Sequence, residues 1–445
     1  MKDEVIRLIN EEFANKQAIK KELSDMNIVD IAEIFEQIDK EKILQIFRLL
    51  PKDKAADIFS YVSLENQKLI IDAITDKELA TIVNDLYVDD AVDLLEEMPA
   101  NVVKRVLKNT DGNTRKIINH FLNYPEDSAG SVMTIEYVDL KKNLTVKQAI
   151  DRIRKTVDDK ETFDICYVTD SQRILEGTVS IRDILLAKDD EKIEDIMDKN
   201  IVFAKTTDDK EFVSSLFMKY DCSSMAVVDK EKRLVGIITV DDAVDIIQEE
   251  NTEDFEIMAA ITPSEKPYLK TNVFRLAFNR IPWLLFLMFS ATLTGFVINK
   301  FESQLAVQSV LIAFIPMLMD TGGNSGSQSA TLAIRGLALN EIKVSDFLVI
   351  MFKEAFIGSI AGFVLAVLNF VRLIFLKYNV MVSMTVCLSI ILTVILANVI
   401  GGILPLIAKF FKMDPALMAA PLITTIVDVI SLIAYFSIAN ALLPF

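Results

Sequence analysis

Histidine and cysteine are scarce in this chain of 445 residues. It holds one histidine, His120, and three cysteines, Cys166, Cys222 and Cys387, without metal-ligand spacing. Disulfides and zinc or copper sites need thiolate or imidazole groups, so we expect none of them. A metal bound here must be held by carboxylates, which favour hard cations such as Mg²⁺ or Ca²⁺. The chain also offers no nucleophile–base pair and no Walker or kinase motif, which argues against an enzyme.

Basic residues are outnumbered: 47 Lys and Arg stand against 64 Asp and Glu, a net charge of −17. The segment from residue 271 onward holds ten basic and seven acidic residues, so the acidic excess lies in the first 270. An acidic surface does not bind nucleic-acid phosphates but attracts cations. The first residues, MKDEVIRLINEEF, are charged and amphipathic, unlike a secretory signal peptide. We therefore expect the acidic half to stay in the cytosol.

Residues 1–126 have the apolar spacing of helices, as in IAEIFEQI and AVDLLEEM. An approximate echo of 24 residues relates the segments around Phe35, Phe59 and Val83. Periods of this length are typical of stacked helix pairs. An irregular helical bundle is the alternative, and either arrangement makes this region an acidic helical domain.

Residues 127–249 contain an internal duplication. The segment ILEGTVSIRD (174–183) returns as RLVGIITVDD (233–242), and YVTD (167–170) returns as AVVD (226–229). Upstream, Met133 pairs in the same way with Met197. Each copy is expected to run helix, strand, turn, strand, helix. The two copies, 127–198 and 199–249, resemble tandem CBS domains because the glycine, the apolar strand and the terminal aspartate recur in register.

Residues 250–272 are acidic and then proline-containing, and they predict a connecting helix that ends near Thr262–Pro263. Residues 273–445 predict five membrane spans, the first within IPWLLFLMFSATLTGFVI (281–298) and the second starting near Leu305. Seven of the ten basic residues in this half then lie on the cytosolic side, which favours a cytosolic N-terminus.

Two of the expected spans carry unusual polar residues. The stretch PMLMDTGGNSGSQ (316–328) has a small-residue pair, Gly322 and Gly326, which indicates either unwound backbone near water or close helix packing. A later span holds Asp428 inside an apolar run. A buried acid costs about 2.5–3.5 kcal/mol on insertion scales, so it normally lines an aqueous path. Pro421 is expected to free a helix carbonyl, and Thr424 lies one turn before Asp428.

The motifs Pro-x5-Gly-Gly-Asn-x-Gly-x-Gln (316–328) and Thr-Thr-x-x-Asp (424–428) resemble those of the MgtE family of magnesium transporters. The order of regions is also similar: a helical N-domain, two CBS domains, a plug helix and five transmembrane helices. The resemblance implies a homodimeric, multi-pass protein of the bacterial inner membrane. It implies a pore Mg²⁺ site at Asp428 of both subunits, with Thr424 and Asn324 beside it.

The resemblance also implies a sensor in which cytosolic Mg²⁺ bridges acidic faces and closes the pore. The matching acids are Asp57, Asp89 and Asp93 of the N-domain, Asp209, Glu211, Asp221, Asp242 and Asp245 of the second CBS copy, and Glu250, Glu253 and Asp254 of the plug. Two carboxylates about 4 Å apart repel by about 4 kcal/mol at an effective dielectric constant of 20, before screening by salt, so closure needs a counter-ion. The resemblance to CBS domains also implies an adenosine-nucleotide site, such as one for ATP, near Asp183 and Asp242. A purely structural role of these copies is the open alternative.

The predicted function is therefore Mg²⁺ import that cytosolic Mg²⁺ closes. A CBS-regulated transporter of another divalent cation is the main alternative. A carrier of an osmolyte or anion is a second one, although an anion path would place positive charge in the spans, where this chain has Asp428. A membrane-bound enzyme is the third.

Overall fold

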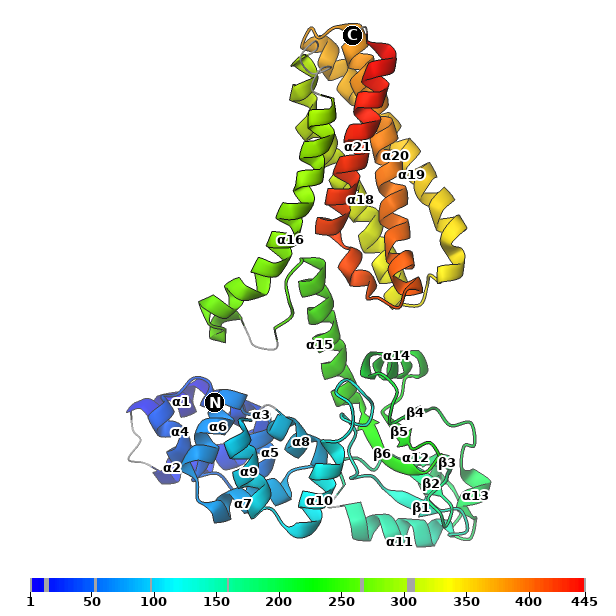
Figure 1. The fold of residues 1–445 in the computed structure, drawn as a ribbon. Helices are drawn as coiled ribbons and strands as arrows, with labels where there is room; N and C mark the ends of the chain where they lie inside the picture. The colour runs from blue at the N-terminus through cyan, green and yellow to red at the C-terminus, as the bar shows by residue number, and fades with distance from the viewer. Residues whose placement is uncertain are drawn as a thin grey trace. The chain divides into compact units, whose positions relative to one another are not determined.

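The computed structural model describes residues 2–11, 16–51, 54–96, 98–157, 160–264, 268–301 and 309–443. These residues form two compact units, Met1–Gln248 and Glu249–Phe445. The first unit combines a helical region with two small sheets, and the second is a bundle of long helices (Figure 1).

The first region of the chain is a stack of short helices. They are α1 (Lys2–Glu11), α2 (Lys16–Asp25), α3 (Ile28–Phe35), α4 (Lys40–Phe47), α5 (Ala55–Ser60), α6 (Leu64–Ala73), α7 (Asp76–Asp85), α8 (Val88–Glu96), α9 (Ala100–Asn109) and α10 (Gly112–Phe121). Side-chain caps begin several of them: Asn27 accepts from Val29 N, Thr75 and Glu78 form a capping box, and Asp111 caps α10.

The helices stack on their second neighbours. Helix α3 packs on α5, α5 on α7 and α7 on α9, while α4 packs on α6 and α8 on α10. The even-numbered helices α4, α6, α8 and α10 begin at residues 40, 64, 88 and 112, so the spacing of 24 is kept throughout. Phe35, Phe47 and Phe59 meet edge to face inside the stack. The prediction of stacked helix pairs is therefore confirmed, and the irregular bundle is not observed.

Two three-stranded sheets follow, and they share one topology. Strand β1 (Asp139–Lys141) pairs parallel with β2 (Ile165–Thr169), which pairs antiparallel with β3 (Leu175–Ser180). In the same way β4 (Phe203–Lys205) pairs with β5 (Ser224–Val228), and β5 with β6 (Leu234–Thr239). The helices of this region are α11 (Val146–Thr156), α12 (Ile181–Leu186), α13 (Ile193–Ile196), α14 (Lys210–Tyr220) and α15 (Val240–Met258). The duplicated order read from the sequence is confirmed.

The repeated glycine and methionine make one packing contact twice. A Cβ on Gly177 would lie 2.7 Å from Met197 Sδ, and a Cβ on Gly236 would lie 2.7 Å from Met133 Sδ. Only glycine therefore fits at these two positions without movement of the methionine. The sequence duplication thus records a repeated close approach of backbone and side chain.

The two sheets also exchange short bridges. Thr134, which precedes β1, exchanges two backbone hydrogen bonds of 2.8 Å with Ile237 in the second sheet. Asp198, which precedes β4, pairs in the same way with Thr178 in the first sheet, with bonds of 2.8 and 2.9 Å. Each sheet is thereby extended by a residue that comes before the other sheet in the chain. The domain boundaries placed after residues 126, 198, 249 and 272 stay predictions.

The second unit is built from α16 (Val273–Lys300), α18 (Ile315–Ala338), α19 (Phe347–Phe375), α20 (Val380–Phe410) and α21 (Ala420–Leu442). In the described residues four helical segments are long and apolar enough to cross a membrane: 273–300, 344–375, 380–410 and 420–442. Helix α18 packs against α20 and α21 but is more polar, so its role as a fifth span stays a prediction. The predicted start near Leu305 lies outside the described residues.

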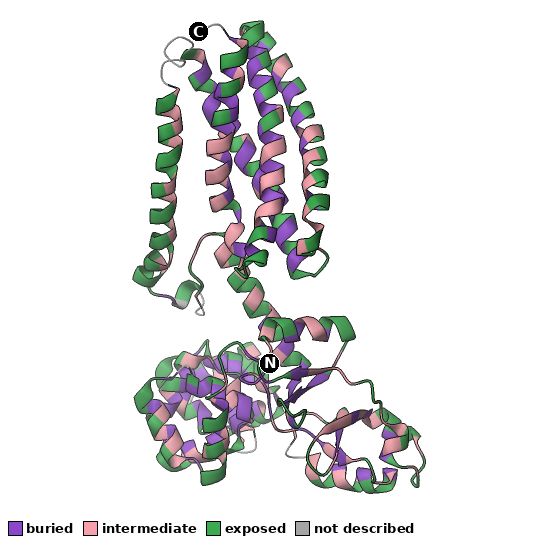
Figure 2. Cartoon of the chain, turned by 45° about the vertical axis from the view of Figure 1, so that its right-hand side comes forward, coloured by how far each residue is buried: buried purple, intermediate pink, exposed green. Residues whose placement is uncertain are grey.

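The outer surfaces of this bundle are apolar. Helix α16 has no buried residue, and Figure 2 shows it in the exposed and intermediate colours along its length. It exposes Phe289 and Phe296, and α19 exposes Phe356 and Phe363. Large apolar side chains in such numbers fit a lipid-facing surface.

Glycine brings the inner helices together. A Cβ on Gly401 of α20 would lie 2.1 Å from the carbonyl oxygen of Gly326 in α18, so the two backbones are in direct contact. Gly322 lies one turn before Gly326, and a Cβ on Gly322 would lie 2.9 Å from Val427 Cγ1 of α21. Because α18 is a continuous helix from Ile315 to Ala338, the small residues serve close packing, and the alternative of unwound backbone is wrong here.

Two local expectations are corrected. Pro421 interrupts no helix, because α21 begins at Ala420 and the proline lies in its first turn, where an N–H has no intrahelical acceptor. Its carbonyl accepts hydrogen bonds from the hydroxyls of Thr424 (2.9 Å) and Thr425 (3.0 Å). The connecting helix ends earlier than expected, at Met258 rather than near Thr262, and Ala260 follows with a φ of 56°.

Candidate metal centre

Three carboxylates meet in the first unit. One oxygen each from Asp89, Glu161 and Asp242 lie within 4.8 Å of one another. Asp89 comes from the first turn of α8, Glu161 from the loop before β2, and Asp242 from the first turn of α15. The helical stack and both CBS-like copies therefore contribute to one acidic cluster.

The local structure fixes the Asp242 side chain and the backbone of Glu161, and it buries Asp89. The Oδ2 atom of Asp242 accepts hydrogen bonds from the hydroxyl (2.5 Å) and the backbone N–H (3.3 Å) of Thr239. The backbone N–H of Glu161 donates to Glu136 O at 3.0 Å. Asp89 lies on the buried side of α8 and is only 9% exposed. Its Oδ1 atom and the Oε2 atom of Glu161 are buried and have no hydrogen-bond partner within the part of the chain that the structure describes.

Burial perturbs the pKa of all three groups, and the charges of neighbouring acids add to it. Burial, followed by the charges of Glu161 and Asp90, raises the pKa of Asp89 well above its usual range. Burial and the charge of Asp242 raise the pKa of Glu161 to about 8. Burial also raises the pKa of Asp242. Buried polar atoms are rarely left without partners, and unpaired buried anions are costly, so the chemistry of these three carboxylates suits a bound cation.

Further acids surround the cluster. Burial, then Asp242 and Asp57, raise the pKa of Asp90 to about 6. The pKa of Tyr61, beside the start of α15, is raised by burial and then by Asp241, Asp90 and other acids. The negative field thus extends over the contact between the helical stack and α15, which favours cation binding.

The structure brings some of the acids predicted for the sensor together and places the others elsewhere. Asp89 and Asp242 are in the cluster, and Asp57 is close enough to act on Asp90. The pKa of Asp245, on the same helix as Asp242, is raised by burial and by Asp241. The others lie elsewhere: Asp93 lines a hollow beside Asp90, Asp209 caps α14, Glu211 is in its first turn, Asp221 ends it with a φ of 49°, and Glu250, Glu253 and Asp254 lie in the later turns of α15.

Sequence reasoning missed Glu161. It belongs to the segment DDKETFD between α11 and β2, which has neither a motif nor a periodic pattern. Only the tertiary path of the loop brings it to Asp242. The acidic nature of the segment was the one signal available, and it is shared by many solvated loops.

The second unit contains the residues predicted for the pore. Asp428 and Thr424 are half-buried on α21, and Thr424 packs against α18, where a Cβ on Gly323 would lie 2.8 Å from Thr424 Cγ2. Asn324 is exposed on α18, and its Nδ2 donates to Asp320 Oδ1 at 3.1 Å. Asp320 and Asn324 thus form a polar pair on α18, while Asp428 lies on α21. Their assignment to a pore stays a prediction.

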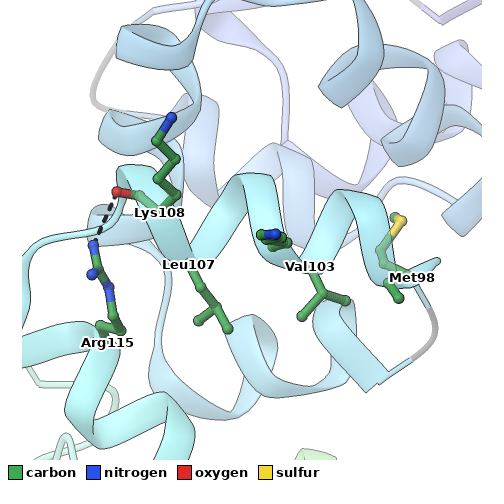
Figure 3. A pocket seen from close by; sticks show the side chains of 7 residues that line it. Met98, Val103, Leu107, Lys108 and Arg115 are labelled. Carbon is green, nitrogen blue, oxygen red and sulfur yellow. Dashed lines mark hydrogen bonds between the residues drawn. The ribbon is translucent and has the colours of Figure 1, made fainter.

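A hollow on α9 and α10 has the opposite charge (Figure 3). Its lining includes three apolar side chains, Met98, Val103 and Leu107. It also includes three cations, Lys104, Lys108 and Arg115. One Nη2–H of Arg115 donates to the Lys108 carbonyl at 3.0 Å. Because three cations line this hollow, it does not qualify as a second cation site.

Sequence comparisons match the regions in the same order. The description "MgtE intracellular N domain" matches residues 26–127, "CBS domain" matches 193–249, and "Divalent cation transporter" matches 315–438. The magnesium transporter MgtE of Thermus thermophilus is 33% identical over 431 residues, which cover 96% of this chain and 95% of that protein. The chain belongs to the MgtE family.

Other MgtE comparisons agree. The magnesium transporter MgtE of Bacillus subtilis is 31% identical over 427 residues, with 94% of this chain and 92% of that protein covered. A crystal structure of the cytosolic domain of the Mg²⁺ channel MgtE in complex with ATP superposes with a TM-score of 0.52 at 32% identity, covering 54% of this chain and 99% of that one. The soluble part of a magnesium transporter gives a TM-score of 0.54 at 27% identity, with coverages of 56% and 99%.

Membership in the MgtE family settles several expectations. The predicted fold class is confirmed except for the number of membrane spans, and so is a membrane protein with a cytosolic N-terminal domain. The family is one of transporters, so the rival prediction of a membrane-bound enzyme is wrong. The family description names divalent cations, which also removes the anion or osmolyte carrier.

Proposed function

We propose that this chain imports Mg²⁺ as a homodimer and that cytosolic Mg²⁺ closes it. The observation that carries the gating proposal is the cluster of Asp89, Glu161 and Asp242, in which two buried carboxylate oxygens lack partners. Magnesium transport is the function of the relatives, and this chain follows them over nearly its whole length. Transport of another divalent cation is the alternative, and a flux assay that compares Mg²⁺ with Ca²⁺ and Co²⁺ separates the two.

For the pore we propose that Asp428 of both subunits binds hydrated Mg²⁺. The acid lies on a helix whose other residues are mostly apolar, and Thr424 precedes it by one turn. Mg²⁺ keeps most of its waters, so two facing carboxylates that contact its hydration shell suit it. Their mutual repulsion in an empty pore is relieved more by a divalent ion than by a monovalent one.

For the sensor we propose that Mg²⁺ bridges the acidic faces of the helical stack and the CBS copies, with further ions at Glu250, Glu253 and Asp254 of α15. Without cations the carboxylates repel, which favours separation of the domains. Mg²⁺ shifts the equilibrium only by the difference between its affinities for the closed and open states. A site assembled from three segments has that difference, because separation of the segments destroys it.

Mg²⁺ should stabilise the first unit against heat. We expect the thermal midpoint of residues 1–260 to rise with Mg²⁺. This fragment contains the compact unit Met1–Gln248, whose counterparts crystallised without the membrane part. At a concentration about 100 times Kd the stabilisation is about 2.7 kcal/mol, or roughly 5–10 °C at this size. The rise should be larger at pH 8 than at pH 6, because the raised pKa of Glu161, about 8, lets protons compete with the metal at low pH.

The matched variants for this measurement are Asp242→Asn, in the cluster, and Asp190→Asn, on an exposed loop. Asp242→Asn should lose at least half of the rise, while Asp190→Asn should keep it. The readout is the difference between midpoints with Mg²⁺ and with chelator, since loss of a repelling charge also stabilises the metal-free form. Equal rises in the two variants would contradict the proposed site.

We further propose that the first CBS copy binds ATP at Asp183. This residue is exposed at the start of α12, where the hydroxyl of Ser180 donates to its Oδ2 at 2.6 Å. The relative's cytosolic domain was crystallised with ATP. Calorimetry with ATP on residues 1–260 should give saturable binding, weakened at least tenfold by Asp183→Asn. Absence of binding heat in the unaltered protein would instead assign this copy a purely structural role.

A further inference from the structure

We propose that Glu161 is a direct ligand of the bridging Mg²⁺, so that one ion joins the helical stack to both CBS copies. The inference deepens the proposed function and rests on its sensor. A cluster of acids alone is no site, but here a second observation points to a ligand. Asp89 is nine-tenths buried and has an unpartnered Oδ1 atom. One of its carboxylate oxygens lies within 4.8 Å of one oxygen each of Glu161 and Asp242. The Oε2 atom of Glu161 is the second buried oxygen of the cluster without a hydrogen-bond partner among the described residues.

The backbone brings Glu161 to this point. Thr134 is held to Ile237 of β6 by two hydrogen bonds, and β6 leads directly to Thr239 and Asp242. Two residues after Thr134, the carbonyl of Glu136 accepts the N–H of Glu161 at 3.0 Å. The loop of the first copy is therefore tied to the end of the second sheet by main-chain bonds. These main-chain hydrogen bonds fix the backbone of Glu161 relative to Asp242.

The third carboxylate changes the chemistry of the site. Three carboxylates carry a charge of −3 against the +2 of the ion, and they leave positions for water in an octahedral shell. Two ligands on the CBS side, Glu161 and Asp242, repel each other even when the helical stack is absent. An ion bound by Glu161 therefore stabilises the pair of copies as well as their contact with α8. All three ligands lie within Met1–Gln248, so the site is complete without the later turns of α15.

Calorimetric titration of residues 1–260 with Mg²⁺ tests the ligand. Glu161→Gln should weaken binding at this site at least tenfold. The matched control is Glu231→Gln, on the exposed turn before β6, which should bind within twofold of the unaltered protein. The double variant Asp89→Asn, Glu161→Gln should lose less than the two single losses combined, because both remove ligands of the same ion.

The thermal midpoint in chelator separates a ligand from a merely structural residue. A ligand that repels its neighbours leaves the metal-free midpoint of Glu161→Gln unchanged or raised. A lowered metal-free midpoint, or Mg²⁺ binding within twofold of the unaltered protein, overturns the inference. Glu161→Asp, which keeps the charge on a shorter side chain, should bind with intermediate affinity, and affinity as weak as that of Glu161→Gln or weaker counts against ligation.

The full-length chain in proteoliposomes separates this inference from the proposed function. If the site senses cytosolic Mg²⁺, the concentration that half-closes Glu161→Gln should rise about tenfold, in step with the loss of binding. A tenfold loss of binding with an unchanged closing concentration upholds the ligand and overturns the sensor role of this site.

Discussion

Asp428→Asn is expected to reduce Mg²⁺ uptake into proteoliposomes to the level of protein-free vesicles. The substitution keeps the size of the side chain but removes the charge that we propose holds the ion in the pore. Asp428 is half-buried on α21, and the helix has no other acid between Ala420 and Leu442. No neighbouring residue on this helix can therefore replace it.

Expression and dimerisation of Asp428→Asn should be normal, because loss of a half-buried charge relieves a desolvation cost. Glu341→Gln, at the exposed turn after α18, is the matched control and should transport normally. Uptake by Asp428→Asn near that of the control would refute the pore assignment.

Removal of residues 1–250 should give a channel whose conductance ignores cytosolic Mg²⁺. The deletion takes away Asp89, Glu161 and Asp242 together, while the five long helices of the second unit keep their own core. In the full-length chain, single-channel open probability should fall as internal Mg²⁺ rises, and in the truncated chain it should stay constant.

Selectivity supplies the control for this truncation. The shortened chain should still prefer Mg²⁺, since Asp428 and Thr424 remain. If internal Mg²⁺ closes the truncated channel at the same concentration as the full-length channel, the sensor role proposed for residues 1–250 is wrong. This holds for any value of the single-channel conductance.

The sequence predicted those features that depend on periodic or duplicated patterns. The approximate 24-residue repeat predicts α3, α5 and α7, and the duplicated segments with their paired glycines predict the two sheets. In both cases a local pattern reflects a contact that is made repeatedly, such as Gly177 with Met197. Such contacts constrain residue types at fixed offsets, which a reader of the sequence can detect.

Features that depend on a single tertiary contact were missed or misjudged. Glu161 reaches Asp242 only because Thr134 pairs with the other sheet, and no local spacing encodes that pairing. The sequence predicts Pro421 inside a helix because no strong capping residue marks the start of α21. Ala419, at the N-cap, makes no side-chain cap. For α18 the sequence leaves unwound backbone and close packing open, and the contact of Gly326 with Gly401 decides for packing.

The exchanged bridges at Thr134 and Asp198 have a consequence for engineering and for evolution. Thr134 comes before the first sheet in the chain but pairs with the second sheet, and Asp198 comes before the second sheet but pairs with the first. Neither copy therefore forms a self-sufficient module. Chimaeras between family members should tolerate replacement of residues 127–249 as a block. A junction between the copies would combine edges from different parents at both sheets, and its product should misfold or aggregate more readily.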